Sequence, residues 1–251
     1  MLSDEELLRY SRQILLAQVD VAGQLKLKAS RVLIVGLGGL GSPVALYLAA
    51  AGIGELHLAD FDTVDLTNLQ RQVLHGTEAV GQPKVVSAMA RLRSINPGIA
   101  LVPHVQALDA DSLRGAIAAV DLVLDCSDNF ATRSAVNAAC FEQGKPLVSG
   151  AAIRLEGQLS VFDPRLASSP CYHCLYGHGS DTELTCSEAG VLGPVVGMVG
   201  SLQALEALKV LAGFGEPLIG RLLLIDGFTS RFRELRLKRD PQCPVCQVRG
   251  G

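Results

Sequence analysis

The stretch that decides the fold is RVLIVGLGGLGSPVALYLAAAG, residues 31–52. Its first five residues form a short apolar run rich in β-branched side chains, which predicts a buried strand. Gly36, Gly38 and Gly41 complete a G-x-G-x-x-G turn, and apolar residues at helical spacing follow. Glycines let the backbone approach a phosphate, and a helix N-terminus presents free N–H groups to the anion. The stretch therefore predicts a nucleotide-binding turn between a strand and a helix.

The residues after this turn leave the kind of nucleotide open. The segment IGELHLAD predicts a second strand that ends at Asp60. A carboxylate at that place can accept hydrogen bonds from ribose hydroxyls, as in dinucleotide-binding folds. On this pattern alone the first hypothesis is an NAD-dependent oxidoreductase. Because a glycine turn is weak evidence by itself, the rest of the chain must decide.

Composition narrows the class of protein. The chain has 251 residues, of which 49% are hydrophobic and 19% charged, with a net charge of −3. This content suits an α/β protein with a large core, and the lack of basic blocks argues against a nucleic-acid surface. The N-terminus lacks an export signal, and glycines interrupt the uncharged run 189–205, so no membrane span is expected. Seven cysteines, an odd number, suit a reducing cytoplasm.

Strand and helix patterns alternate as far as residue 150. The expected strands after the first are ELHLA, IALVPHV, DLVLDC and KPLVSG, and the expected helices are QPKVVSAMARLRSI, ADSLRGAIAAV and FATRSAVNAACFEQG. This alternation predicts a Rossmann-like α/β fold, a mostly parallel sheet with helices on both faces. Beyond it, RLEGQLSVFD, RLLLIDGF and FRELRLKR predict an antiparallel extension. We expect one domain, 1–251, with a nucleotide-binding half at 1–150 and a second half at 151–251.

Two helix starts are marked by local signals. Ser3 and Glu6 form a capping box, and Pro83 is expected in the first turn of the helix that contains Lys84. The first helix would carry its apolar side chains on one face, namely Leu7, Leu8, Ile14 and Leu15.

Four of the cysteines form two C-x-x-C pairs. Cys171 and Cys174 lie in PCYHC, and Cys243 and Cys246 lie in CPVC. Each pair can supply two corners of a tetrahedral Zn²⁺ site, so the two pairs complete a four-thiolate site. A closed site leaves no position for water or substrate, which predicts a structural zinc clip. A redox C-x-x-C is the alternative. Cys126 and Cys140 are expected to be buried apolar residues.

Charged residues near the glycine turn favour ATP over a redox dinucleotide. Arg71 follows the second strand, Lys84 begins a helix, and Asp128 follows the strand that ends at Asp125. Because the carboxyl ends of parallel strands meet at one crevice, these groups should gather there. A reaction at phosphate needs cations to offset charge and a carboxylate to hold Mg²⁺. The alternatives are solvated surface cations and an Asp128 that merely caps the next helix.

Together these motifs resemble the MoeB/ThiF family of bacterial adenylyltransferases. These enzymes activate ubiquitin-like sulfur-carrier proteins and are relatives of the ubiquitin-activating enzymes. The resemblance covers essentially the whole chain. It is carried by RYSRQILL, VLIVGLGGLGSP, DFDTVDLTNLQRQ, GQPKV, LDCSDN, EAGVLGPVVG and the two cysteine pairs. LVSGAAIRLEGQ and FDTVDLTNLQRQ look most like the members that serve molybdopterin synthase, and the thiamine-pathway members come second.

The resemblance implies adenylylation of the C-terminal glycine of a carrier that ends in Gly-Gly, with release of pyrophosphate. ATP and Mg²⁺ would act beside a structural Zn²⁺, and Asp128 would hold the Mg²⁺. Arg12 matches an arginine that reaches the other subunit's active site, which implies a homodimer. The implied catalytic residues are Arg12, Arg71, Lys84 and Asp128. The implied ATP contacts are Gly39, Asp60, Thr67, Asn68, Leu69, Gln70, Arg71, Lys84, Asp128 and Asn129. The second half, 151–251, would bind the carrier.

Cys186 separates two versions of this function. In a thiamine-type enzyme it would take part in sulfur transfer, whereas in a molybdopterin-type enzyme an external persulfide donor would attack the adenylate. Two rivals belong to other classes. An NAD-dependent oxidoreductase leaves Arg71, Lys84 and the zinc clip unexplained. A non-catalytic zinc-stabilised scaffold has no use for that set of charges.

Overall fold

The computed structural model describes residues 1–177 and 189–247. Within these ranges eight strands form a single sheet in the order β3-β2-β1-β4-β5-β6-β7-β8. Neighbours from β3 to β5 pair in parallel, and β6, β7 and β8 add on in antiparallel pairs. The strands are β1 (Arg31–Val35), β2 (Glu55–Ala59), β3 (Ala100–His104), β4 (Leu122–Asp125), β5 (Leu147–Ile153), β6 (Glu156–Phe162), β7 (Arg221–Asp226) and β8 (Arg231–Arg236). The predicted fold class, a mostly parallel sheet with an antiparallel extension, is confirmed.

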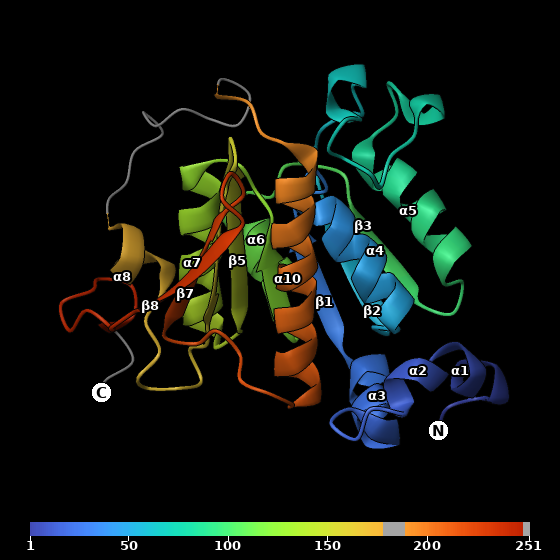
Figure 1. Ribbon diagram of the computed structural model, residues 1–251, viewed down its shortest axis with the longest axis horizontal. Coiled ribbons are helices and arrows are strands. Elements are labelled where there is room, and N and C mark those ends of the chain that lie inside the picture. The colour runs from blue at the N-terminus through green and yellow to red at the C-terminus, as the bar shows by residue number, and fades with distance from the viewer. Residues whose placement is uncertain (178–188, 248–251) are drawn as a thin grey trace.

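Helices cover both faces of the sheet (Figure 1). The helices on one face are α4 (Gly41–Ala51), α5 (Lys84–Ile95) and α10 (Gly193–Ala212). Those on the other face are α6 (Ala110–Ala118) and α7 (Phe130–Gln143), with the short α8 (Tyr172–Tyr176) beside α7. The expected boundary at residue 150 falls inside β5, which pairs with β4 on one side and β6 on the other.

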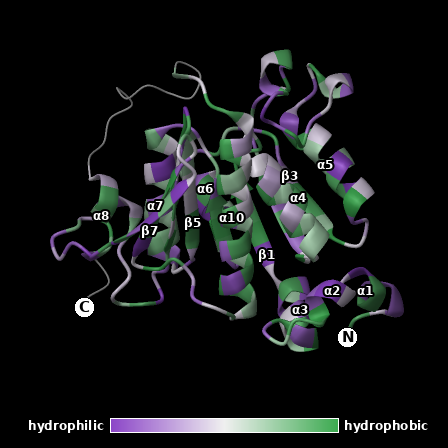
Figure 2. Ribbon diagram, viewed as in Figure 1, coloured by the Kyte–Doolittle hydropathy of each residue, from purple (hydrophilic) through white to green (hydrophobic). Residues whose placement is uncertain are grey.

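The alternation of side chains along β1 explains why the sheet has two covered faces. Val32 and Ile34 point into the apolar cluster under α4 and α10, while Leu33 and Val35 point into the cluster under α6 and α7. Each of these side chains contributes about 1.5–3 kcal/mol when it is fully buried. Figure 2 shows the central strands β1 and β5 coloured mainly as hydrophobic. A strand that is apolar on both sides is therefore fixed at the centre of the fold.

Helix α10 is long and apolar enough to cross a membrane by length and composition. It packs against α4, β5 and β6, and half of its most apolar window is buried inside the protein. Gly200 allows the closest approach, since a Cβ there would lie 2.5 Å from the carbonyl oxygen of Leu40. The expectation of a tightly packed core segment in this region agrees with the structure.

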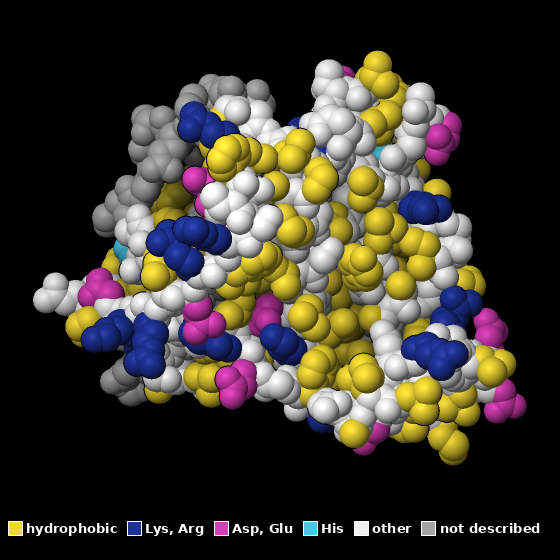
Figure 3. Space-filling model, viewed as in Figure 1, with side chains coloured by type: hydrophobic (Ala, Val, Ile, Leu, Met, Phe, Trp, Pro, Cys, Tyr) yellow, Lys and Arg dark blue, Asp and Glu magenta, His cyan; other side chains and the backbone are white. Residues whose placement is uncertain are grey.

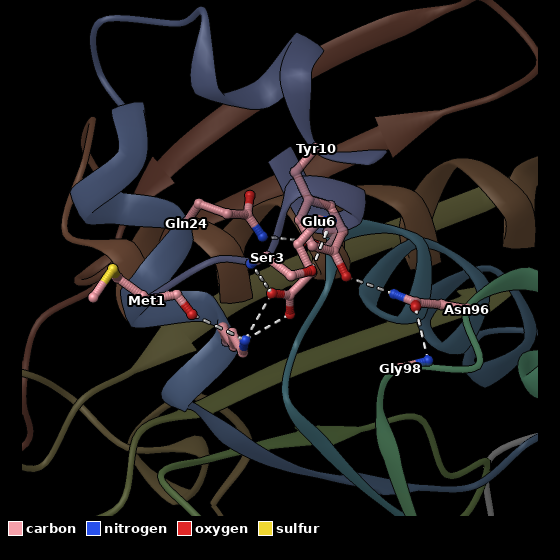
Figure 4. A network of polar contacts seen from close by, with 9 residues as sticks. Met1, Ser3, Glu6, Tyr10, Gln24, Asn96 and Gly98 are labelled. Atoms are coloured by element: carbon pink, nitrogen blue, oxygen red, sulfur yellow. Dashed lines mark hydrogen bonds and ion pairs between the residues drawn. The ribbon is translucent and has the colours of Figure 1, made fainter. Parts of the chain in front are cut away.

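The N-terminal helix departs from the prediction. The capping box of Ser3 and Glu6 forms, but the helix stops at Tyr10, between α1 (Asp4–Arg9) and α2 (Ser11–Ile14). The Tyr10 ring is buried, and its hydroxyl accepts a hydrogen bond from the side chain of Asn96 at 2.8 Å (Figure 4). Docking this one ring interrupts the helix and leaves Leu8 78% exposed and Leu15 73% exposed. The predicted single helix with Leu7, Leu8, Ile14 and Leu15 on one face is therefore wrong, because the chain forms two short helices that meet at Tyr10.

The segment between β2 and α5 is irregular. It contains two single 3₁₀ turns, η1 (Leu66–Asn68) and η2 (Thr77–Ala79). Pro83 occupies the N-cap position of α5, one residue before the expected first turn, and Lys84 is the first helical residue. This placement brings Lys84 to the end of the sheet where β1, β2 and β4 finish.

Candidate nucleotide and metal sites

The glycine turn joins β1 to α4. Gly36 has a φ of +92°, and a Cβ there would lie 2.7 Å from the carbonyl oxygen of Cys126. The third glycine, Gly41, could carry no Cβ because one would lie 1.9 Å from the carbonyl oxygen of Gly36. The amides of Gly38 and Gly39 find no acceptor within the described part of the chain. The turn thus presents free N–H groups beside a helix N-terminus, the arrangement that favours a phosphate.

Residue Leu37 fixes the turn in place from both sides. Its N–H donates to the Asp60 carboxylate at 2.7 Å, and its carbonyl oxygen lies 3.0 Å from Nε2 of His75. His75 must donate through Nε2, so Nδ1 accepts from the Ser87 hydroxyl at 2.9 Å. Burial lowers the pKa of His75, which favours this neutral form. No pattern in the sequence indicates this role of His75.

A cavity of about 400 Å³ opens at this end of the sheet, where β1, β2 and β4 finish. A volume of this size suits a nucleotide. Its wall contains six of the ten predicted ATP contacts, namely Gly39, Asp60, Arg71, Lys84, Asp128 and Asn129. A side-chain oxygen of Gln72 is buried in the same wall with no hydrogen-bond partner among the described residues. An unpaired buried acceptor costs free energy, so this wall is suited to receive a ligand that donates a hydrogen bond.

Asp60 and Lys84 form the floor of the cavity with a residue that the sequence analysis did not select, Asp62. Lys84 is nearly buried and lies 2.9 Å from Asp62 and 3.9 Å from Asp60. Burial raises the pKa of Asp60, while Lys84 and the amides of Leu37 and Asp62 oppose that rise. The Asp62 side chain is 54% exposed and can move. Lys84 is therefore a buried cation whose partner can give way to phosphate.

Arg71 lies directly beside the glycine turn. Its Cγ would be 3.6 Å from a Cβ at Gly39, and its Nη1 donates to the carbonyl oxygen of Thr67 at 3.1 Å. Of the predicted ATP contacts, Thr67, Asn68, Leu69 and Gln70 lie in or after η1 and are not in the cavity wall. They stand next to Arg71 and support its backbone, since Asn68 accepts the Arg71 N–H at 3.1 Å.

The loop after β4 supplies the acidic group. Asp125 is fully buried, and one of its carboxylate oxygens accepts the Ser127 amide at 3.1 Å and the Ser127 hydroxyl at 2.6 Å. Asn129 caps α7 by accepting the Thr132 N–H at 2.8 Å, so the alternative that Asp128 is the cap is wrong. Asp128 is exposed in the cavity wall and has no partner within residues 1–177 and 189–247. An unpaired carboxylate beside a phosphate-binding turn suits Mg²⁺, which takes few protein ligands plus phosphate oxygens.

Arg12 does not reach the cavity. It is an exposed residue of α2, and α2 packs against α3 (Asp20–Ala29). Helix α3 precedes the start of β1, whereas the cavity lies at the other end of that strand (Figure 1). Arg12 therefore cannot act on a nucleotide in its own chain.

The four C-x-x-C cysteines come together on the far side of α7. The Sγ atoms of Cys171 and Cys174 are 3.7 Å apart, and Cys171–Cys243 and Cys174–Cys246 are each 3.5 Å apart. A disulfide would need about 2.05 Å. Thiolates around one Zn²⁺ at about 2.3 Å stand about 3.8 Å apart, and all four ligand atoms lie within 4.8 Å of one another. The donor set therefore fits a tetrahedral zinc ion and does not form a redox disulfide.

Neighbouring groups complete this cysteine cluster. The Asp240 N–H donates to Cys174 Sγ at 3.4 Å, and Arg239 donates to the carbonyl oxygens of Ala167 and Cys246. Burial raises the pKa of Cys171, and it raises that of Cys246 to about 11. The pKa of Cys243 is instead lowered despite its burial, by hydrogen bonds from the amides of Cys246 and Val245. A bound cation would favour the thiolate form of all four sulfurs. The other two described cysteines, Cys126 and Cys140, are buried as expected, and Cys186 lies outside the described residues.

Comparison with known proteins gives a consistent family. The model of the ThiF family matches residues 10–245. The molybdopterin-synthase adenylyltransferase of Escherichia coli K12 is 56% identical over 245 residues, which are 98% of this chain and 98% of that protein. The sulfur carrier protein ThiS adenylyltransferase of the same organism is 49% identical over 98% of this chain and 97% of its own.

Comparison with solved structures shows the same fold in another protein. The crystal structure of E. coli MccB with AMPCPP and selenomethionine MccA superimposes with a TM-score of 0.85 and 27% identity. The match covers 95% of this chain and 73% of that chain. The described fold therefore also occurs in a protein whose crystal contains an ATP analogue.

Proposed function

The chain belongs to the ThiF family, and we propose that it adenylylates the C-terminal glycine of a ubiquitin-like sulfur-carrier protein, with the small subunit of molybdopterin synthase as the first candidate. The observation that carries the proposal is the cavity in which a glycine turn, two cations and an unpaired carboxylate meet. Relatives named for adenylyl transfer to sulfur-carrier systems match nearly the whole chain. The chain would act in the cytoplasm.

In the proposed reaction the carrier's terminal carboxylate oxygen attacks the α-phosphorus of ATP. The bond from that phosphorus to the bridging oxygen breaks, pyrophosphate leaves, and an acyl adenylate remains. A glycine carboxylate is ionised at neutral pH, so no protein base is required. Gly38 and Gly39 would hold phosphate oxygens, and Arg71 and Lys84 would offset their charge. Asp128 would hold Mg²⁺, which neutralises charge on the departing pyrophosphate.

The proposal explains features of the cavity that the two rival hypotheses leave unexplained. An NAD-dependent oxidoreductase has no need of Lys84, Arg71 and an unpaired Asp128 around one phosphate turn. A passive scaffold has no need of a cavity with free amides. The second half offers a partner surface, since every residue of the edge strand β8 is exposed and it carries Arg231, Phe232 and Leu235. We place the carrier there.

The direct test is ATP–pyrophosphate exchange with carriers that end in Gly-Gly. One arm uses the small subunit of molybdopterin synthase, a second uses the thiamine-pathway carrier, and each is repeated with the two glycines deleted. We expect exchange that needs the intact tail and is fastest with the molybdopterin carrier. Binding of NADH without any exchange would reject the proposal in favour of the oxidoreductase.

Cys186 distinguishes the two pathway versions. Carboxylate attack on phosphorus does not involve a thiol, so Cys186→Ala should leave pyrophosphate exchange within about twofold of wild type. Sulfur delivery from a persulfide donor to the adenylated carrier is the second readout. It should survive in a molybdopterin-type enzyme and fall in a thiamine-type enzyme. A large loss of exchange in folded Cys186→Ala protein would contradict the division between adenylation and sulfur transfer.

A homodimer is the third part of the proposal. Arg12 lies at the wrong end of its own sheet, and the exposed Leu8 and Leu15 stand beside it on the N-terminal arm. Figure 3 shows hydrophobic side chains gathered on the face where α4 and α10 lie. Tyr47 of α4 and Leu205 of α10 are both exposed. Exposed apolar area of this kind marks an interface. A second copy would cover it and bring Arg12 to the partner's cavity.

Subunit complementation tests this arrangement. Arg12→Ala and Lys84→Ala should each be nearly inactive alone. Co-expressed, they form mixed dimers in which one of the two sites has both Arg12 and Lys84. Because half of randomly paired dimers are mixed, activity should return to about a quarter of wild type. No recovery in purified mixed dimers would place Arg12 in the site of its own chain, and an active Arg12→Ala variant would place it outside the reaction.

A further inference from the structure

Tyr10 packs its ring against the C-terminal end of α4. The ring is 4% exposed, and a Cβ at Gly52, the residue that follows α4, would lie 2.4 Å from its Cζ. The ring therefore rests directly on the backbone at Gly52. Tyr10 precedes the exposed Arg12 by two residues. This contact thus attaches the segment that carries Arg12 to the body of the protein.

The hydroxyl of Tyr10 is held by Asn96, the residue that ends α5. Asn96 is almost completely buried, and its side-chain nitrogen donates to the Tyr10 hydroxyl and to the carbonyl oxygen of Ala49, each at 2.8 Å. Its side-chain oxygen accepts the N–H of Gly98 at 3.2 Å (Figure 4). Because both donors and the acceptor of this amide are in use, its orientation is fixed, and so is the place of the Tyr10 hydroxyl.

A second attachment follows directly after Arg12. Gln13 Nε2 donates to Oε1 of the buried Gln24 at 2.7 Å and to the carbonyl oxygen of Ala51 at 3.1 Å. Gln24 Nε2 donates to the same Ala51 oxygen at 2.9 Å. Ala51 is the last residue of α4, where carbonyl oxygens lack partners within the helix. The chain is therefore bound to the end of α4 on both sides of Arg12.

The docked ring also decides the direction of α2. The sequence pattern favours one helix through this segment, whereas Tyr10 leaves the helical path and separates α1 from α2. Helix α2 has only four residues, and so short a helix owes its stability to tertiary contacts. The direction in which α2 presents Arg12 is therefore set by the contacts of Tyr10 and Gln13, and not by local helix preference.

We propose that Tyr10 is a positioning residue that holds Arg12 in the direction needed to reach the cavity of a second copy of this chain. The proposal rests on the proposed homodimer and its adenylation reaction. A guanidinium that meets phosphate acts best when its approach is fixed before the substrate binds. Helix α4 begins at the glycine turn and ends at the Tyr10 contact, so the same helix holds a phosphate-binding turn at one end and the Arg12 segment at the other.

The test uses mixed dimers in which one site is complete. One chain carries Arg12→Ala and supplies Lys84, the other carries Lys84→Ala and supplies Arg12, and two affinity tags purify the pair. Tyr10→Leu, which removes the ring and the hydroxyl but stays apolar, is added either to the chain that supplies Arg12 or to the chain that supplies Lys84. The two products contain the same three substitutions once each, so each is the matched control of the other. Pyrophosphate exchange and the unfolding midpoint are measured for both.

We expect exchange to fall at least about tenfold when Tyr10→Leu is in the chain that supplies Arg12, since a displacement of about 1 Å at a reacting group can cost about 100-fold. In the other placement exchange should stay within about twofold of the parent mixed dimer, because that chain has no Arg12 to misplace. If Tyr10→Leu chains do not assemble, Tyr10→Phe replaces the leucine variant. It keeps the ring and loses the hydroxyl, and we expect a loss of about threefold in the first placement alone.

Equal losses in the two placements would overturn the proposal, because they would show a general effect on the fold. A loss confined to the chain that supplies Lys84 would overturn it as well, since Tyr10 would then act through α4 on its own cavity. A parent mixed dimer without exchange, beside an active wild type, would show that Arg12 does not serve the partner's cavity, and the role of Tyr10 would fall with the homodimer arrangement.

A failure of the adenylation function gives a different result. Wild-type protein would then exchange pyrophosphate with no carrier, and the affinity of the same two mixed dimers for AMPCPP, measured by calorimetry, would decide the role of Tyr10. Weaker binding only when the chain that supplies Arg12 carries the Tyr10 variant supports the proposal, and equal affinities overturn it.

Discussion

Asp128→Ala is expected to abolish pyrophosphate exchange while the protein stays folded. Asp128 is exposed in the cavity wall and forms no bond to the rest of the described chain, so its loss should change stability by less than about 0.5 kcal/mol. A metal ion contributes several kcal/mol to stabilising charge at phosphate, which corresponds to a rate loss of at least about 100-fold. The measurement is exchange rate against Mg²⁺ concentration, with the unfolding midpoint recorded in parallel.

Asp111→Ala is the matched control for this prediction. Asp111 is an almost fully exposed aspartate in the first turn of α6, and it is not in the cavity wall. It should keep full exchange activity. Asp128→Asn refines the result, because the amide keeps the shape and loses the charge. Near-normal exchange by Asp128→Ala would place the metal on another group, with Asp62 as the next carboxylate in the wall.

Replacing the neighbouring cations, Lys84 and Arg71, should affect activity and stability differently from replacing Asp128. Lys84→Ala leaves Asp60 and Asp62 without their shared cation, and burial already raises the pKa of Asp60. Its loss of activity should therefore come with some loss of stability, unlike that of Asp128→Ala. Within the described residues the Arg71 side chain makes one hydrogen bond, to the carbonyl oxygen of Thr67, so its removal should affect ATP binding more than folding.

The framework of this site could be predicted because it depends on short-range rules. Apolar runs with a turn signal at each end identified the strands, and the rule that ligands bind beyond the carboxyl ends of parallel strands placed Asp60 and Asp128 together. The two C-x-x-C pairs could be joined because thiolate chemistry admits few partners. These inferences need no knowledge of how distant side chains pack.

The residues that escaped prediction act through tertiary contacts. Nothing in the α7 sequence distinguishes Arg133 from a surface arginine until its two hydrogen bonds to the carbonyl oxygen of Ser127 are seen. Tyr10 ends a helix because its ring docks on Asn96, a residue far along the chain. Asp128 and Asn129 are both good caps, so sequence alone could not say which of them would cap α7 and which would face the cavity.

Cys243→Ser is expected to remove the zinc and to destabilise the whole protein. The cluster joins α8 to the segment after β8, which are distant in the sequence, and its four sulfurs have the spacing of a zinc tetrahedron. Zinc binding to such sites is worth on the order of 10 kcal/mol. Even about 4 kcal/mol would lower the unfolding midpoint of a chain this size by roughly 8–16 °C. Metal analysis and thermal unfolding measure both effects.

Cys140→Ala provides the control, because Cys140 is an equally buried residue of α7 that is not one of the four clustered cysteines. It should keep one zinc per chain, with only the small loss of stability that follows a reduced side chain. Arg239 and Asp240 hold the C-terminal segment only near the cluster, so zinc loss should also expose that segment to limited proteolysis. Wild-type protein with less than about half a zinc per chain, or Cys243→Ser protein that retains its metal, would show that the four sulfurs do not form the zinc site, since three ligands bind far more weakly than four.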